Sequence, residues 1–423
     1  MQPRTATTTA DFRWLAGLCT ARILFSLIFV AYAAILPLLQ AAWHMSSREA
    51  GLVQSGWHVG YVVSLFGGGL LIDRFGASRT FLGMSAAGCF ATLAFASLAH
   101  DSLSGLLLYT LAGVFAGGAY TPVLALIAQR FAPATRGRAM GWYLAAGSLG
   151  YAVGLAASGP LVALGGWRFS LLVSACGAIV ATLMAFALMR GSHDRPRAEH
   201  AAQAQLSRLV EVLRNRPAML AIGAYTFHSW ELLGMWAWIP AFLAAAAARG
   251  GSMDASVVGF GALLAALTHL ISMAGSLLGG RWSDRFGRTA VMIGMAVTSL
   301  ACSALFGWLV GAPLWFLVVI AMVFNLSAIG DSPVYSTALT ELVPARVLGS
   351  AYAIRSVMGF GVGAVSPWFF GAVLDLTRGY GLSDTIAWGL AWSTLAIGAL
   401  PGPVMSWMLR RSREARAMAE GRR

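Results

Sequence analysis

Long runs of apolar residues alternate with short polar connections along the whole chain. A helix needs about 20 mostly apolar residues to cross the hydrocarbon core of a bilayer. Twelve such runs occur, six in each half of the chain. They lie at residues 14–39, 50–72, 80–100, 103–129, 139–164, 168–190, 217–245, 256–280, 290–310, 313–341, 348–376 and 385–409. The pattern therefore predicts an all-α membrane protein with twelve transmembrane helices.

One short motif occurs at the same place in both halves of the chain. The segments Gly69–Gly76 and Gly280–Gly287 share the pattern G-x-x-x-D-R-F-G and lie 211 residues apart. Pro122 and Pro333 keep the same offset, as do the prolines at 133 and 344. Several matches at one offset indicate an internal duplication. We therefore expect two pseudo-symmetric halves of six helices each.

The two halves are expected at residues 1–190 and 217–423, with a cytoplasmic linker between them at 191–216. The linker is polar and rich in arginine. In its second part, from about Ala201 to Arg214, leucine and valine recur at helical spacing. This spacing favours a short amphipathic helix on the membrane surface. A solvated tether is the alternative interpretation.

Composition and charge agree with a membrane protein. With 58% hydrophobic and 11% charged residues, the chain is too apolar for a soluble globular protein. The 29 basic residues are all arginine and collect on alternate connections. Cytoplasmic loops carry such an excess, so we expect both termini in the cytoplasm and a place in a bacterial inner membrane. Arginines spread over short loops argue against a nucleic-acid partner, despite the net charge of +13.

No other kind of chemistry is indicated by the sequence. The four cysteines are widely spaced within predicted spans, which suggests neither disulfides nor a metal site. The chain carries no phosphate-binding loop and no hydrolase motif. We therefore expect no enzyme and no cofactor, but a monomer in the lipid bilayer that handles a small molecule and draws its energy from a gradient.

The repeated motif resembles the loop signature of the major facilitator superfamily, and the duplicated twelve-span layout is similar over nearly the whole chain. The resemblance implies secondary transport by alternating access, in which two six-helix halves rock around a midplane site. Trp230–Pro240 and Gly330–Pro367 look like the cyanate, nitrate/nitrite and oxalate/formate permease branches. Gly159-Pro160 and the glycines that follow are similar to an antiporter motif, but their spacing is wider.

In that superfamily the loop motif acts as a latch that stabilises the outward-facing state. The matching positions are Gly69, Asp73, Arg74, Gly76 and Arg79 in the first copy, and Gly280, Asp284, Arg285 and Gly287 in the second. The first glycine of each copy would let neighbouring helices approach closely. The carboxylate would accept hydrogen bonds from exposed N–H groups at a helix start. A simple tight loop is the alternative.

Four ionisable residues that fall inside predicted spans are the first functional candidates, because charge is costly in lipid. They are Arg22, Glu231, Asp331 and Arg355. Arg22 lies about eight residues into its predicted span, roughly 12 Å deep, and its planar guanidinium suits a carboxylate substrate. It could instead pair with Glu231, two residues from its symmetry-related position. Arg355 could line the cavity, pair with Asp331, or join the latch through Asp73.

Proton coupling is the second role expected of these residues. His228 and Glu231 are three residues apart and share a helix face, so they form a candidate proton-carrying pair. A hydrogen bond between helices is the simpler alternative for Glu231. Asp331 precedes Pro333, whose ring frees backbone carbonyls for local rearrangement. A break there would suit a gate or a proton site.

Aromatic and amide side chains near these positions complete the candidate substrate site. Most aromatic residues of a membrane protein lie at its two interfaces or in packing contacts. The better cavity candidates are in or beside the polar spans. They are Tyr32, Trp57, Tyr61, Tyr120, Tyr225, Trp236, Asn325 and Tyr335.

Taken together, one or two buried arginines and few buried acids favour a small organic or inorganic anion as substrate. A carboxylate that moves with protons is the leading interpretation. A drug/proton antiporter for lipophilic cations is the alternative within transport, favoured by the aromatic residues and disfavoured by Arg22. A membrane sensor that keeps the fold without transporting is the alternative of another class.

Overall fold

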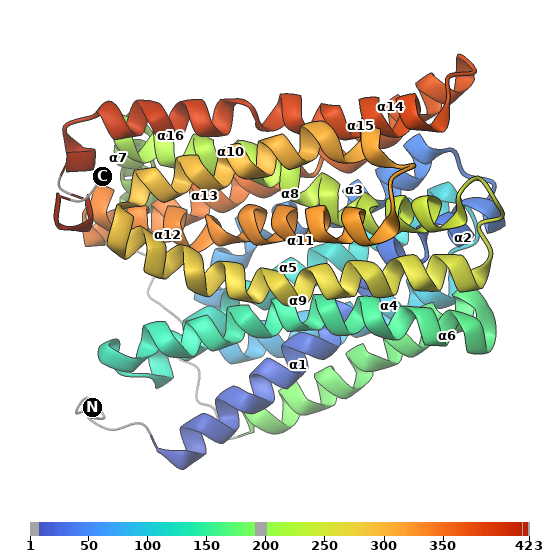
Figure 1. The fold of residues 1–423 in the computed structure, drawn as a ribbon. Coiled ribbons are helices and arrows are strands. Elements are labelled where there is room, and N and C mark those ends of the chain that lie inside the picture. Colours follow the sequence, from blue (N-terminus) through green and yellow to red (C-terminus); the bar gives the residue numbers. More distant parts are fainter. Residues whose placement is uncertain (1–7, 191–200, 417, 422–423) are drawn as a thin grey trace.

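The computed structural model describes residues 8–190, 201–416 and 418–421. The described chain is helical and contains no β-strand. Figure 1 shows long helices running side by side, with the N-terminus, the C-terminus and α7 (Ala201–Arg214) at one end of the bundle. Arg13, Arg74 and Arg130 lie on helix ends or turns at this same end, which we call the arginine-rich end.

The N-terminal half, as far as the structure describes it, is built from six helices. They are α1 (Thr9–Ala34), the short α2 (Leu36–Ala42), α3 (Ser47–Phe75), α4 (Ala77–Leu98), α5 (Ser102–Arg130) and α6 (Pro133–Met189). Helix α6 contains two spans, because Gly165 and Gly166 leave helical geometry and Gly166 adopts a positive φ of 75°. The chain turns back at these two glycines.

The C-terminal half continues with more frequent breaks. Its helices are α8 (Arg216–Ala248), α9 (Ala255–Phe286), α10 (Arg288–Phe306), α11 (Leu314–Gly330), α12 (Ser332–Leu342), α13 (Leu348–Gly363), α14 (Ser366–Gly379), α15 (Asp384–Ala399) and α16 (Pro401–Arg411). The pairs α11–α12, α13–α14 and α15–α16 each form one broken span. Short 3-10 turns lie at Gly307–Leu309, Ala345–Val347, Glu414–Arg416 and Met418–Gly421.

The predicted number of spans is confirmed for the described residues. Ten helical segments are long and apolar enough to cross a bilayer. Division of α6 at its glycine turn adds the eleventh span, and α15 with α16 forms the twelfth. The helix expected from about Ala201 is present as α7, whereas residues 191–200 of the expected linker lie outside the described residues.

One predicted span needs correction. The first span was expected at 14–39, but α1 begins at Thr9 and ends at Ala34. Pro37 then lies in the first turn of α2, where its missing N–H costs nothing. Arg22 is therefore 13 residues from the start of α1, roughly 20 Å along the axis, which places it near the middle of the span. The break expected beside Pro333 is present, since α11 ends at Gly330 and α12 begins at Ser332.

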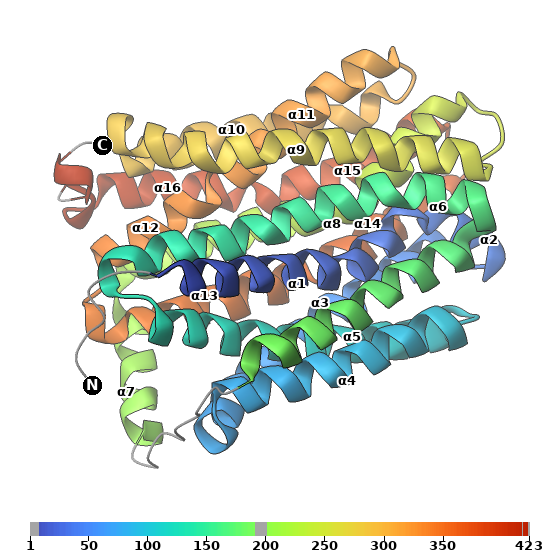
Figure 2. The same ribbon diagram turned by 90° about the horizontal axis from the view of Figure 1, so that it is seen from below.

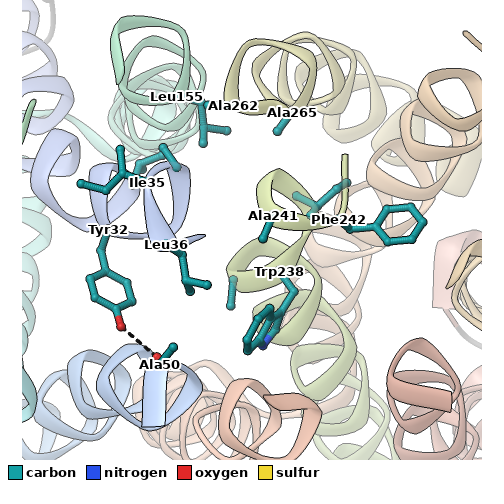
Figure 3. Packing of buried hydrophobic residues seen from close by; sticks show 14 of the residues in the cluster. Tyr32, Ile35, Leu36, Ala50, Leu155, Trp238, Ala241, Phe242, Ala262 and Ala265 are labelled. Carbon is teal, nitrogen blue, oxygen red and sulfur yellow. Dashed lines mark hydrogen bonds between the residues drawn. The ribbon is translucent and has the colours of Figure 1, made fainter. Parts of the chain in front are cut away.

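The apolar core shows how the halves are joined. One cluster of buried residues includes side chains of both halves, among them Tyr32, Leu155, Trp238 and Ala262 (Figure 3). Two further clusters lie toward the arginine-rich end, one built around Trp14, Phe131 and Met189 of the N-terminal half, the other from Val212 of α7 and residues of the C-terminal half. The halves therefore share one core at the arginine-poor end and divide into separate cores at the arginine-rich end.

Polar contacts and glycines complete the closure of the arginine-poor end. Helices α3 and α14 pack against each other, and α6 lies beside α9 (Figure 2). The carboxylate of Asp375 in α14 accepts hydrogen bonds from the backbone N–H groups of Ser47 (2.9 Å) and Arg48 (2.6 Å) at the start of α3. Gly159 of α6 and Gly259 of α9 pack backbone to backbone, and a Cβ on Gly159 would lie 2.7 Å from the Gly259 carbonyl oxygen.

Candidate functional site

A narrow cavity lies within the N-terminal half and is lined by helices α1, α3, α4, α5 and α6. Its volume of about 70 Å³ corresponds to several water-sized spaces, since one water needs roughly 10–15 Å³ by this measure. The cavity has room for a solute of a few heavy atoms. Its polar lining comes mainly from Arg22, Trp57, Tyr61, Tyr120, Tyr143 and Tyr151.

Arg22 supplies the positive charge of this cavity. Its guanidinium lies over the rings of Tyr120 and Tyr143, with 5.1 and 5.6 Å between Cζ and the ring centroids. Gly147 leaves room for it, because a Cβ there would lie 3.3 Å from Nε. The Nε atom is buried and has no hydrogen-bond partner among the described residues. Cation–π contacts stabilise the charge by about 0.5–2 kcal/mol but do not neutralise it.

The alternative pairing of Arg22 with Glu231 is not observed in the described chain. Both carboxylate oxygens of Glu231 accept hydrogen bonds from α10, one from Ser303 (2.6 Å) and one from Ser299. The Glu231 side chain is 2% exposed. It therefore forms the hydrogen bond between helices that was the simpler interpretation.

Around the break between α11 and α12 lies a buried polar group in the C-terminal half. His228 faces two partners, with Nδ1 3.2 Å from the Asp331 carboxylate and Nε2 3.1 Å from the Ser332 hydroxyl. His228 and Asp331 are 4% and 1% exposed. The rings of Tyr225 and Tyr335 lie 5.6 and 6.0 Å from the imidazole. Asp331 Oδ1 is nevertheless buried without a hydrogen-bond partner among the described residues, so the approach of His228 Nδ1 is a close contact and not a hydrogen bond.

Arg355 of α13 borders the same polar group without pairing with its acid. Its guanidinium lies 4.5 Å from the ring centroid of Tyr225 and donates to the Ser336 hydroxyl. Its Nε, like that of Arg22, is buried without a hydrogen-bond partner in the part of the chain that the structure describes. Neither expected acid is its partner among these residues, because Asp331 faces His228 and Asp73 makes no hydrogen bond or ion pair there.

Aromatic side chains connect the cavity with the C-terminal half. Tyr120 lies within electrostatic range of both Arg22 and Arg355. Tyr61 contacts Tyr120 at 6.1 Å between ring centroids and Phe360 of α13 at 5.1 Å. The two arginines therefore share Tyr120 as a common neighbour, although they belong to different halves.

A second bridge between the halves is formed by Tyr151 and Trp236, whose ring centroids are 4.6 Å apart. The Trp236 indole donates to the Asn325 side-chain oxygen (3.3 Å), and the Asn325 amide donates to the Thr268 hydroxyl (2.8 Å). His269 lies against both Trp236 and Tyr151. The side chains of Trp236, Asn325 and Thr268 bond to one another. This arrangement is better suited to the wall of a site than to a surface that binds a ligand.

Tyr32 does not belong to the cavity. Its hydroxyl donates to the Ala50 carbonyl oxygen of α3 (2.9 Å), as Figure 3 shows, and its ring packs against Phe95 and Tyr109. The side chain is fully buried. Tyr32 is therefore a residue of the core and does not line this cavity.

Tyr143 and Tyr151 are cavity residues that the sequence analysis missed. Both lie on α6, on either side of Gly147 at intervals of four residues. That spacing places all three on one helix face. A small residue flanked by two tyrosines on one face of a span is the signal that could have found them.

The loop motif has the expected turn but not the expected helix contacts. Gly76 and Gly287 adopt φ values of 86° and 94° between consecutive helices, which only glycine does at little cost. A Cβ on Gly69 or Gly280 would touch nothing within 4 Å. The close approach expected of Gly280 is made by the preceding Gly279, whose Cβ would lie 3.2 Å from Cα of Gly330.

The charged residues of the two motif copies differ. Asp73 is half-buried and without a described partner, whereas Asp284 pairs with Arg288, which also binds Glu341 (3.0 Å). Arg74 and Arg285 each lie over the ring of the following phenylalanine. Arg79 is exposed. Within the described chain, no latch contact between the halves involves Asp73 in this conformation.

Comparison with known proteins identifies a family over most of the chain. A family model described as Major Facilitator Superfamily matches residues 18–367. A probable sulfoacetate transporter, SauU of Cupriavidus necator, is 25% identical over 386 residues, covering 86% of each chain. The hexuronate transporter of Bacillus subtilis is 24% identical over 87% of this chain and 89% of its own.

Solved structures share the fold. A mutant form of the nucleoside transporter NupG superimposes with a TM-score of 0.75 at 15% identity, covering 94% of this chain and 98% of NupG. At that identity the likeness concerns the arrangement of helices. It agrees with the twelve spans and the two halves described above.

Proposed function

Because the chain belongs to the major facilitator superfamily, we propose that it is a secondary transporter of a small organic anion. One observation carries this proposal. The guanidinium of Arg22 lies in mid-span, lines a cavity and has no acidic partner among the described residues. An uncompensated charge in a membrane interior is costly. A carboxylate or sulfonate would supply the missing charge and accept from the unpartnered Nε–H.

Substrate contact is proposed for the residues around this charge. Trp57, Tyr61 and Tyr120 line the cavity with Arg22. Tyr225, Trp236, Asn325, Tyr335 and Arg355 lie in the C-terminal half, and we assign them to the substrate path or its wall. Tyr143 and Tyr151 join this set because they line the same cavity.

Named relatives support the choice of an organic anion. One is named for sulfoacetate and another for hexuronate. Both names denote organic acids that are anions at neutral pH. A lipophilic cation would instead meet Arg22 as a like charge, although the many aromatic rings of the cavity keep a drug antiporter as the second candidate.

Alternating access is supported by the asymmetry between the two ends. The halves share a core at the arginine-poor end and have separate cores at the arginine-rich end. If the arginine-rich end is cytoplasmic, as the positive-inside rule predicts, this conformation faces inward. The unpartnered Asp73 fits that state, because the latch residues Gly69, Asp73, Arg74, Gly76 and Arg79 and their second copy would engage when the protein faces outward.

For proton coupling we favour the His228–Asp331 pair. It lies at the α11–α12 break, and His228 is within electrostatic range of Arg355. Glu231 accepts hydrogen bonds from two serines of α10. We therefore expect a change of charge at His228 or Asp331 to alter the electrostatic environment of Arg355 more than a change of charge at Glu231 would.

A ligand panel tests the proposed function. The purified protein in detergent would be heated with succinate, butyrate, glucuronate, sulfoacetate, nitrate and tetraphenylphosphonium, alongside Arg22→Ala. Ligands that bind the folded state raise its melting temperature. We expect a shift with an organic anion that disappears in Arg22→Ala. A shift with tetraphenylphosphonium alone, unchanged in the variant, would favour drug antiport.

A further inference from the structure

We propose that the site selects organic dianions, holding one acid group at Arg22 of the N-terminal half and the other at Arg355 of the C-terminal half. This inference rests on the proposed function and specifies its substrate class. It is carried by three observations on the described residues: an unsatisfied donor on each arginine, the absence of an acid beside either, and their shared neighbour Tyr120.

The first observation is that each of the two arginines has a buried N–H donor without a hydrogen-bond partner. Nε of Arg22 and Nε of Arg355 are both buried and lack a hydrogen-bond partner in the described structure. Most buried polar atoms in proteins are bonded, so exceptions call for an explanation. Nε of Arg136, near the start of α6, is a third such atom, but Arg22 and Arg355 share Tyr120 as a neighbour, so this pair indicates two acceptor groups at one site.

The second observation concerns the neighbouring acids. His228 lies within electrostatic range of Arg355, and its Nδ1 is 3.2 Å from the carboxylate of Asp331. Glu231 is held by Ser299 and Ser303. Within the described chain, the electrostatic neighbours of Arg22 are tyrosines. A monoanion would therefore leave one of the two guanidinium groups uncompensated, whereas a dianion would neutralise both.

The third observation is the position of the aromatic side chains. Tyr120 is within electrostatic range of both arginines, and Tyr61 links Tyr120 to Phe360 of the opposite half. A short apolar body between two acid groups would lie against these rings. Because its two ends would bind different halves, such a ligand would also draw the halves together at the site.

The test compares acids that differ only in their second charge. Dissociation constants for succinate and butyrate, glutarate and valerate, and adipate and hexanoate would be measured by calorimetry on the full-length protein. Each charge-assisted hydrogen bond is worth about 1.5–3 kcal/mol, so at least one dianion should bind roughly tenfold or more tightly than its matched monoanion.

Variants assign the two charges. Arg355→Gln should lower the affinity for the dianion to about that for the matched monoanion, and Arg355→Lys should retain part of the preference because the charge remains. Arg378→Gln, an exposed arginine of the same half that pairs with Asp384, is the matched control and should change neither. The unliganded melting temperature of each variant would confirm that it is folded.

The possible outcomes separate this inference from the function on which it rests. Equal affinity for matched acids, or a dianion preference that survives in Arg355→Gln, would overturn the dianion site and leave anion transport standing. If no acid of any pair binds, and sulfoacetate and glucuronate also fail, the proposed function itself is contradicted.

Discussion

At the scale of single residues, the proposed function rests on buried charges that have no acidic partner among the described residues. Sequence analysis found Arg22, Asp331 and Arg355 because a charged residue is conspicuous in an apolar span. It could not find their partners, since these depend on how each helix is rotated about its axis. Glu231 illustrates this limit: it lies near the position related to Arg22 by the repeat, but it faces Ser299 and Ser303.

The different surroundings of Tyr32 and Tyr151 give a prediction about stability and binding. Tyr32→Phe removes a buried hydrogen bond between α1 and α3. Such bonds contribute about 0.6 kcal/mol on average in membrane proteins, so the melting temperature should fall slightly while anion affinity stays unchanged. Tyr151→Phe, in the cavity lining, should reduce affinity with little effect on stability. Thermal unfolding and calorimetry would measure both, and the reverse pattern would contradict this assignment.

Proton coupling gives a second prediction at this scale. Asp331→Asn should abolish uptake driven by a pH gradient but leave exchange of substrate across the membrane, because exchange needs no net proton movement. Glu231→Gln should retain pH-driven uptake. Proteoliposomes with an imposed pH gradient would be used, with the exposed Asp384→Asn as control. If only Glu231→Gln lost uptake driven by the pH gradient, the proton-coupling role would belong to Glu231 instead.

At the scale of helices, breaks and caps position the site. Sequence predicted the α11–α12 break from Pro333 and a loop at each copy of the motif, where the structure has Gly76 and Gly287 at positive φ. It did not predict which glycines permit close packing, since this depends on the neighbouring helix. Gly279 packs against Gly330, whereas a Cβ on Gly280 would touch nothing within 4 Å. Local sequence patterns also could not predict that a carboxylate of the other half caps α3.

That cap leads to a prediction for the arginine-poor end. Asp375 accepts from Ser47 and Arg48 in the first turn of α3, where the helix dipole favours negative charge. Asp375→Asn should weaken the closure of this end by about 1 kcal/mol, roughly a fivefold shift in population. The change should favour the outward-open state if the arginine-poor end is external.

Distance measurements would check this shift. Spin labels at Arg168→Cys and Tyr380→Cys, both exposed and on different halves, should show a larger population of long distances in Asp375→Asn. Asp384→Asn on the same surface should leave the distribution unchanged. An unaltered distribution in Asp375→Asn would show that the cap does not hold this end closed.

At the scale of the whole molecule, the duplication is a reliable guide to architecture but not to the site. The offset of the repeated motif predicted twelve spans in two halves, and the helices and the family match confirm them. The halves are nevertheless unlike in polarity: the enclosed cavity belongs to the N-terminal half, and the buried acids around the α11–α12 break and α10 belong to the C-terminal half. Repeat positions therefore predict helices better than they predict chemistry.

The measurement that tests the central claim most directly is uptake of radiolabelled succinate and glucuronate into proteoliposomes that contain either the wild-type protein or Arg22→Gln. The account predicts saturable uptake of at least one of these anions and a loss of roughly tenfold or more in Arg22→Gln, at equal amounts of folded, reconstituted protein. Uptake of an organic anion that is unaffected by Arg22→Gln would contradict the account, as would transport of tetraphenylphosphonium in its place.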